Sequence, residues 1–161
     1  VGGATPVIAD ARAAGTDGAV LAVKPRIVAE TAARALPMLA VDPRAAIAAV
    51  AGFEIIAMAR FFAAGAAAGT TLLLDGYVAT AAALVAEKLA PGTARQMIAA
   101  HRSAEPGHGA ALAKLGLVPL LDWQMRLGEG SGALVALPLL DSAAAILRDV
   151  ALLSDLLTPA P

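Results

Sequence analysis

Apolar residues along this chain alternate between short unbroken runs and longer stretches of helical length. The runs at residues 70–74 and 97–100 are bounded by glycine or polar residues, which is typical of short strands buried on both faces of a parallel sheet. Start and stop signals such as Asp42-Pro43 and Pro91-Gly92 delimit the helical stretches. The predicted helices cover residues 26–36 behind Pro25, 43 to about 50, 55–68, 79–89, 108–115 and 132–151. This alternation predicts an α/β fold with a parallel sheet between helices.

Polar loops follow both predicted strands. Asp75 and Gly76 come directly after the first strand, and residues 101–108, with the sequence HRSAEPGH, follow the second. In open α/β sheets, ligands bind outside the carboxyl ends of the strands. Position alone therefore makes these two loops candidates for a binding site.

Composition and charge narrow the classes of function. The 161 residues carry 12 basic and 13 acidic side chains, so no electrostatic footprint for nucleic acid is present. Although 59% of the residues are hydrophobic, the longest uncharged run, residues 61–74, is too short to span a membrane. No signal-peptide pattern opens the chain, and it contains no cysteine. We expect a cytoplasmic protein that binds neither nucleic acid nor membrane.

A carboxylate stands among glycines in the segment RLGEGSG, residues 126–132. Glycine allows positive φ and close approach of a ligand, and free N–H groups at a helix entrance suit an anion. Glu129 is thus mounted as a working acid or base would be. The same residues are also ordinary in a turn that leads into a helix, so the motif alone leaves both interpretations open.

Several motifs together resemble one family. The segments HRSAEPGH at 101–108, PLLD at 119–122 and RLGEGSGA at 126–133 resemble, in sequence and spacing, the C-terminal half of nicotinate-nucleotide-dimethylbenzimidazole phosphoribosyltransferases. The resemblance continues through residues 74–84 and 52–55. It weakens near Gly15-Thr16-Asp17 and Lys24, where alanines at 13 and 14 replace the family's usual glycine and threonine. About residues 13–150 are covered, with the most specific motifs between 74 and 140.

The resemblance implies a fold, a reaction and a set of site residues. The fold is the C-terminal part of the family's Rossmann-like layers, and the enzyme is a pentosyltransferase of cobalamin nucleotide-loop assembly that needs no metal or cofactor. It moves phosphoribose from nicotinate mononucleotide to dimethylbenzimidazole, giving nicotinate and α-ribazole phosphate. Glu129 is the expected catalytic base, because desolvation beside a flat apolar azole disfavours an ionised carboxylate. The expected substrate-binding residues are Lys24, Asp75, Gly76, Ser103, Leu127, Gly128 and Gly130.

The same polar residues allow other interpretations. The two histidines, His101 and His108, do not have the spacing of a common zinc site, so no metal is expected. Ser103 lacks an evident triad and suits a phosphate or ribose hydrogen bond better than nucleophilic attack. Asp75 could cap the helix at 79–89 or contact the ribose. Arg126 could pair with Asp122 or with phosphate.

The resemblance also covers only part of the family. The family's N-terminal half carries a second acidic segment, GEMGIGNTT, which has no counterpart in this chain, and the chain begins with Val1. We therefore expect residues 1–161 to be a single partial α/β domain, with helix 132–151 as a candidate for a small helical subdomain. The full-length enzyme is expected to be a homodimer. The alternatives are a catalytically incomplete nucleotide- or azole-binding fragment and a non-enzymatic interaction module.

Overall fold

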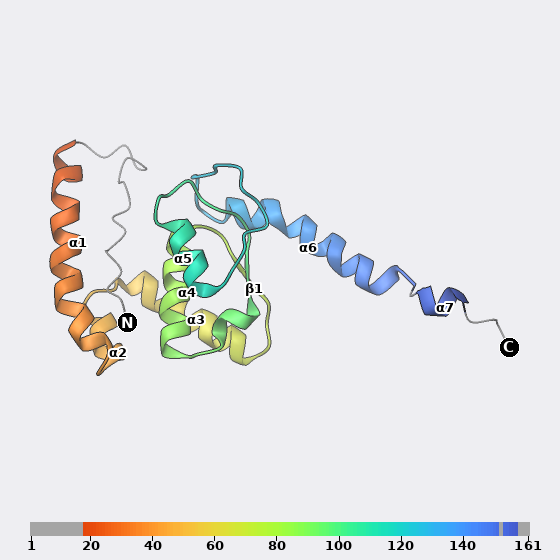
Figure 1. Cartoon of the computed structure of the whole chain (residues 1–161), viewed down its shortest axis with the longest axis horizontal. Coiled ribbons are helices and arrows are strands. Elements are labelled where there is room, and N and C mark those ends of the chain that lie inside the picture. Colours follow the sequence, from red (N-terminus) through yellow and green to blue (C-terminus); the bar gives the residue numbers. More distant parts are fainter. Residues whose placement is uncertain (1–17, 152, 158–161) are drawn as a thin grey trace.

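The fold is described by a computed structural model for residues 18–151 and 153–157 (Figure 1). Helices dominate, and two short strands lie near the middle of the chain. In chain order the elements are α1 (Gly18–Leu39), α2 (Pro43–Ala48), α3 (Phe53–Ala67), β1 (Leu72–Leu74), α4 (Tyr77–Leu89), η2 (Thr93–Gln96), β2 (Met97–Ala99), α5 (His108–Leu115), α6 (Ser131–Asp149) and α7 (Leu153–Leu157).

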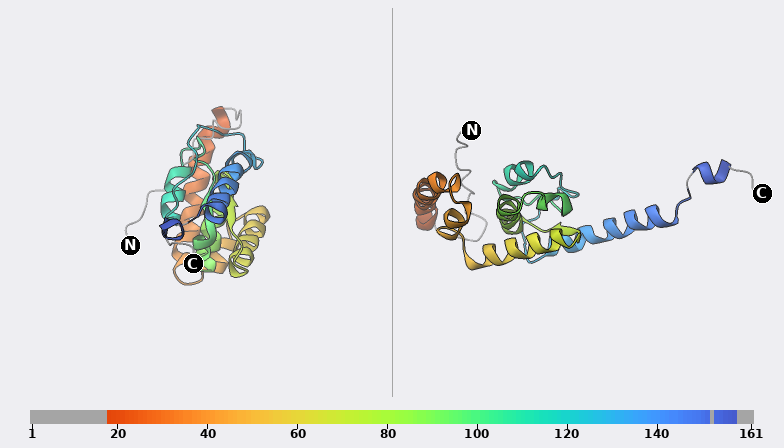
Figure 2. Two further views of the ribbon diagram at one scale, coloured as in Figure 1. Left: turned by 90° about the vertical axis from the view of Figure 1, so that its right-hand side faces the viewer. Right: turned by 90° about the horizontal axis from the view of Figure 1, so that it is seen from below.

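The two strands form the parallel pair that the apolar runs predicted. Leu72 pairs with Met97 and Leu74 with Ala99. Their buried side chains pack with those of α3 and α4, and Ala82, Ala83 and Ala86 supply the close helix contacts. Figures 1 and 2 show α3 and α4 beside this strand pair, with α5 above α4. The α/β layering is confirmed, and it aligns the carboxyl ends of both strands at one edge.

Local signals explain several helix boundaries. The Asp42 side chain accepts a hydrogen bond from the Ala45 N–H at 3.0 Å, and Pro43 occupies the first helical turn, where its missing N–H costs little. At the other end of α5, Gly116 takes a left-handed conformation with φ 71°. The predicted starts and stops at these positions are confirmed.

The first helix is longer than predicted. The sequence placed its start behind Pro25, yet α1 runs from Gly18 to Leu39 with Pro25 and Pro37 inside it. A proline removes one backbone hydrogen bond and strains one turn, and the alanine- and leucine-rich neighbours sustain the helix on both sides. Sequence analysis also missed the short segments η2 and α7, since pieces of four and five residues carry too little periodicity.

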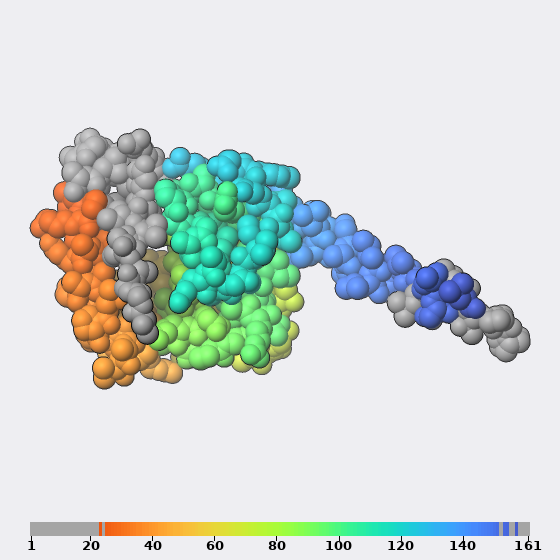
Figure 3. All heavy atoms as spheres, in the orientation of Figure 1, coloured from red at the N-terminus to blue at the C-terminus, as the bar shows by residue number. Residues whose placement is uncertain are grey.

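The long helix α6 projects away from the body of the molecule (Figures 1 and 2). Its first turns are partly buried, whereas Leu134, Ile146 and Leu147 are mostly exposed. The space-filling view shows most of its length free of other described elements (Figure 3). By length and composition α6 could cross a membrane. An 18-residue stretch of it has a mean hydropathy of 1.4, and 11% of that stretch is buried. One helix of this kind is weak evidence for a membrane span.

Candidate functional site

Three loops meet at the carboxyl ends of the two strands. Ala100 N–H donates to the carbonyl oxygen of Leu74 at 2.9 Å, which ties the chain after β2 to the end of β1. Leu121 then extends the arrangement: its N–H donates to the Ala100 carbonyl, and its own carbonyl accepts from Arg102 N–H at 2.7 Å. Behind this junction, Ala100, Leu121 and Ala136 form a small buried apolar cluster. The loops that the sequence singled out therefore converge on the start of α6.

Glu129 sits in an unusual backbone conformation. Gly128, Glu129 and Gly130 have φ angles of 81°, 60° and 83°, so the acid itself takes the left-handed region that L-residues with a side chain rarely adopt. The Ser131 hydroxyl donates to the Gly128 carbonyl at 2.7 Å and closes the turn. The Glu129 side chain is exposed. The interpretation as a turn that leads into a helix is confirmed, and the interpretation of Glu129 as a working acid or base stays a prediction.

Asp75 holds this turn in place from the end of β1. One of its carboxylate oxygens accepts the Gly130 N–H at 3.2 Å, and the other accepts the Ala133 N–H at 2.9 Å. These are donors at the N-terminus of α6, where a carboxylate is favoured. The prediction that Asp75 could cap the helix at 79–89 is wrong, because α4 begins after Gly76 with no side-chain cap. Asp75 instead caps a helix that begins more than 50 residues later.

His101 fills the space between the strand ends and α6. Its side chain is 3% exposed, and its Nε2 lies 3.9 Å from Oδ1 of Asp75. A Cβ added at Gly132 would overlap the imidazole ring, and one added at Gly76 would lie 3.6 Å from Nε2. The ring thus lies between two glycines from different elements. Its Nδ1 is buried without a hydrogen-bond partner among the described residues.

His108 is a buried, neutral structural histidine. Its Nδ1 accepts the Ser103 N–H at 2.8 Å, and its Nε2 lies 2.8 Å from the Thr80 hydroxyl. That hydroxyl donates its proton to the Gly76 carbonyl, so Nε2 must carry the imidazole proton. Burial, and then the neighbouring His101, lowers the pKa of His108 to about 4. The histidine fixes the loop that carries Ser103.

Ser103 lines a small hollow beside the HRSAEPGH loop. The hollow measures about 210 Å³ and is bordered by Arg102, Glu105 and Gln124. The Ser103 hydroxyl oxygen accepts the Glu105 N–H at 3.3 Å, so the side chain serves its own turn. None of the residues that line this hollow belongs to the Glu129 turn.

The arginine pairs near the site differ from the predicted pair. Arg102 contacts Asp122 at 2.8 Å, and Arg126 contacts Glu105 at 3.6 Å. The suggested pairing of Arg126 with Asp122 is therefore wrong, because Arg102 occupies that carboxylate. The Arg126 contact instead links the start of the glycine segment to the HRSAEPGH loop.

Two predicted substrate residues stand apart from this arrangement. Lys24 lies in α1, which Figures 1 and 2 place at the opposite end of the molecule from α6, and its side chain lies outside the described residues. Leu127 precedes the Glu129 turn but is 78% exposed, so no described residue covers it as the wall of an azole pocket would require. The structure brings together Asp75, Gly76, Gly128, Glu129 and Gly130 at the strand ends.

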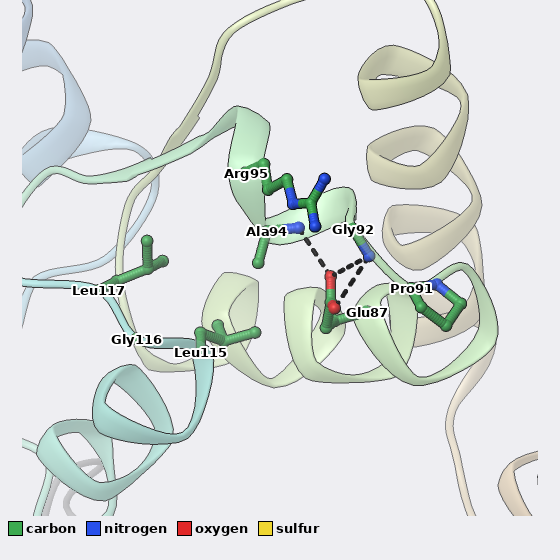
Figure 4. Close-up of a pocket in the computed structure, with 8 residues that line it drawn as sticks. All are labelled: Glu87, Pro91, Gly92, Ala94, Arg95, Leu115, Gly116 and Leu117. Atoms are coloured by element: carbon green, nitrogen blue, oxygen red, sulfur yellow. Dashed lines mark hydrogen bonds between the residues drawn. The ribbon is translucent and has the colours of Figure 1, made fainter.

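A second polar hollow lies at the other edge of the strand pair (Figure 4). It measures about 570 Å³, and its walls include Glu87 of α4 and the loop before β2. Both Glu87 oxygens contact the Gly92 N–H, and one also accepts the Ala94 N–H at 2.8 Å. The carboxylate is thus occupied by its own loop.

Sequence reasoning missed two contributors to the site. Neither Thr80 nor Gly132 was predicted as a site residue, because a threonine or glycine at a helix start is ordinary. Only the folded chain shows that Thr80 orients His108 and that Gly132 makes room for His101. His101 was considered as a metal ligand or as a triad partner of Ser103, and not as a packed residue. In the described ranges, no three metal-binding side chains come together.

Known proteins are similar to this chain along most of its length. A family model described as "Phosphoribosyltransferase" matches residues 2–155. The nicotinate-nucleotide–dimethylbenzimidazole phosphoribosyltransferase of Mycobacterium tuberculosis is 47% identical over 152 residues, which is 94% of this chain and 42% of that protein. The protein of the same name from Mycobacterium ulcerans is 51% identical over 76% of this chain and 33% of its own length.

A solved structure agrees with the sequence relatives. The crystal structure of CobT from Thermus thermophilus has a TM-score of 0.72 and 42% identity, over 83% of this chain and 39% of that one. This chain spans less than half the length of the proteins it matches. The family model nevertheless covers nearly all of it, and the motifs around Glu129 lie inside the match. The chain therefore belongs to the nicotinate-nucleotide–dimethylbenzimidazole phosphoribosyltransferase family.

Proposed function

We propose that this chain carries part of the active site of an enzyme that transfers phosphoribose from nicotinate mononucleotide to a dimethylbenzimidazole-type azole. The products are nicotinate and α-ribazole phosphate, an intermediate in the assembly of the cobalamin nucleotide loop. Relatives that are 47% and 51% identical carry the name of this transferase. Because the chain spans 42% or less of those relatives, the activity is assigned to the full-length protein.

The conformation of Glu129 is the observation that carries the proposal. A residue with a side chain at φ 60° costs on the order of 1 kcal/mol or more, and such strain gathers at functional sites. A glycine here would relieve that strain. No structural partner justifies an acid instead, since the Glu129 carboxylate makes no hydrogen bond or ion pair within the described part of the chain. The exposed carboxylate next to the strand ends is therefore available to a substrate.

The reaction needs one proton acceptor beside the azole. A ring nitrogen of dimethylbenzimidazole uses its lone pair to attack the anomeric carbon of the phosphoribose, and the bond from that carbon to the pyridine nitrogen breaks. The bond's electron pair neutralises the pyridinium, and nicotinate leaves. The azole's N–H proton passes to the Glu129 carboxylate, which acts as general base. Leu127, two residues earlier and exposed, contributes apolar surface for the azole ring.

The phosphate half of the donor requires hydrogen-bond donors and positive charge. Lys24, Ser103 and the glycine backbone at Gly76 and Gly128 are the proposed contacts, whereas Asp75 acts through the Glu129 turn, because both of its carboxylate oxygens already accept N–H groups from the start of α6. The Gly130 N–H is already donated to Asp75. Gly130 would therefore contribute through close approach of its backbone and not through its donor.

The setting of the full-length enzyme is also proposed. We place it in the cytoplasm as a homodimer, without nucleic-acid or membrane partners. Residues 1–161 carry a net charge of −1, which offers no attraction to polyanions in this part of the enzyme. The exposed apolar side chains of α6 are assigned to protein contacts and not to lipid, because the first turn of this helix is anchored to Asp75 beside the strand ends.

The direct test replaces Glu129 by Gln in the full-length enzyme. The amide keeps the shape of the side chain but cannot accept the azole proton, so kcat should fall by roughly 10²-fold or more. Binding of dimethylbenzimidazole should stay within about threefold, because that binding rests on apolar contact. Glu54→Gln, at an exposed carboxylate in the first turn of α3, is the matched control and should leave kcat unchanged.

Each outcome of this experiment has a meaning. Full activity of Glu129→Gln would overturn the assignment of the base. Binding of both substrates without turnover by the unsubstituted full-length protein would favour the nucleotide- or azole-binding alternative. Absence of small-molecule binding would favour an interaction module.

A further inference from the structure

His101 is a buried polar group at the strand ends that the proposed reaction does not use. It follows β2, its side chain is 3% exposed, and Asp75 is the charged group beside it, with Nε2 3.9 Å from Oδ1. It makes no hydrogen bond within the described residues, and Nδ1 is fully buried. Burying an imidazole without a hydrogen-bond partner costs free energy, so a role for this ring in positioning its neighbours is worth testing.

The proton of this imidazole can be placed. A buried N–H without an acceptor is rarer, and costs more, than a buried lone pair without a donor. Because Nδ1 lacks a partner among the described residues and Nε2 faces a carboxylate, the proton belongs on Nε2. The positive end of that N–H then points at the carboxylate that accepts the Gly130 and Ala133 N–H groups at once.

The ring also has a steric role. Gly132 leaves no room for a Cβ beside the imidazole, so the second residue of α6 rests directly on it. Gly76 approaches from the end of β1, with 3.6 Å between its would-be Cβ and Nε2. The imidazole is therefore a spacer between β1 and α6 at the point where Asp75 binds Gly130 and Ala133.

We propose that His101 is a positioning residue that holds the Asp75 carboxylate against the start of α6 and thereby fixes the left-handed turn that presents Glu129. It does not touch substrate. The inference rests on the proposed function for its link to catalysis, whereas the link to the turn is structural. Loss of the Nε2 donor should slow the chemical step and leave substrate affinity almost unchanged.

The test compares two amides in the full-length enzyme. The Gln side chain places its N–H donor where Nε2 lies, and the shorter Asn places it near Nδ1, so only His101→Gln keeps a donor toward Asp75. His101→Asn should lower kcat by about tenfold or more with KM for both substrates within about threefold, and His101→Gln should restore most of kcat. A purely structural role would not separate the two amides in this way.

A second readout does not depend on the reaction. Backbone hydrogen exchange at Gly130 and Ala133 should be about tenfold faster in His101→Asn than in His101→Gln. Gly92 and Ala94, whose N–H groups are held by Glu87, provide the internal control and should be unchanged. If the unsubstituted enzyme makes no product, the proposed function fails while this comparison still decides the inference.

A further variant covers the case in which His101→Asn does not fold. Gly132→Ala pushes a methyl group into the ring and displaces it without changing its chemistry. It should give the same loss of kcat and the same faster exchange at Gly130 and Ala133. Equal kcat and equal exchange in the Gln and Asn variants, or an unaffected Gly132→Ala enzyme, would overturn the proposal.

Discussion

Two carboxylates hold backbone turns at opposite edges of the strand pair. Glu87 accepts N–H groups from Gly92 and Ala94, and Asp75 accepts N–H groups from Gly130 and Ala133. In both turns a glycine with positive φ leads into a helical segment. The chemistry of the two anchors is therefore the same.

The two anchors differ in sequence distance and in what they present. Glu87 closes a loop of five to seven residues, whereas Asp75 reaches across 55 and 58 residues. The longer closure costs more chain entropy and forms only when the strands and α6 are in place. The distant anchor holds an acid in a strained conformation, and the local anchor holds no second acid among the residues that line its hollow. The same interaction stabilises a loop in one place and holds the turn of an exposed carboxylate in the other.

The largest expected effect is a dependence of folding stability on pH. It separates the two anchors, because a buried histidine lies only on the Asp75 side. The folded pKa of His108, about 4, lies below its ordinary value of 6.5, so the unfolded chain takes up a proton first as pH falls. The free energy of unfolding should be highest above pH 6.5 and should decline by on the order of 3 kcal/mol between pH 6.5 and 4. Denaturant unfolding of the full-length protein across this range measures it. His108→Asn should flatten that dependence, and an unchanged slope would contradict the role given to His108.

Asp75→Asn tests the distant anchor. The amide removes the charge and can accept only one of the two N–H groups well, so the Glu129 turn should loosen. We expect kcat of the full-length enzyme to fall by about 10- to 100-fold, the scale of a charge-assisted hydrogen bond used in positioning. Steady-state kinetics with nicotinate mononucleotide and dimethylbenzimidazole provide the measurement. A kcat equal to that of the unsubstituted enzyme would remove Asp75 from the site.

Glu87→Gln tests the local anchor and should have the smallest effect on catalysis. Losing the charge of a carboxylate that accepts two backbone N–H groups should cost about 1–2 kcal/mol of unfolding free energy. The turn at Gly92 is remote from Glu129, so kcat should change by less than about twofold. Chemical denaturation and kinetics on the same preparation separate the two effects. A large loss of kcat with intact stability would erase the distinction between the anchors.

The sequence predicted the elements better than it predicted the contacts. Both strands, and most helix boundaries, follow from local signals such as Asp42 capping α2 and Gly116 ending α5. The extension of α1 through Pro25 was missed, because tolerance of proline depends on the rest of the helix. The partners of Asp75 and His101 could not be predicted, since residues far apart in the sequence meet only through the packed fold.

The candidate site shows the same division. The glycine segment made Glu129 a candidate but left an ordinary turn equally open, and the resemblance to the family implied the reaction. What the sequence could not provide is the conformation of Glu129, with φ 60°, or the anchor that maintains it. Lys24 remains a prediction from resemblance, with its side chain outside the described residues.

The central claim is that Asp75 acts on catalysis through the turn that carries Glu129. A double-mutant cycle on kcat of the full-length enzyme, with Asp75→Asn and Glu129→Gln singly and together, tests it most directly. If the claim holds, Asp75→Asn lowers kcat by about tenfold or more when Glu129 is present, and by less than about twofold when Glu129 has been replaced by glutamine. Equal losses from Asp75→Asn in both backgrounds would show that Asp75 works independently of Glu129, and would contradict the account.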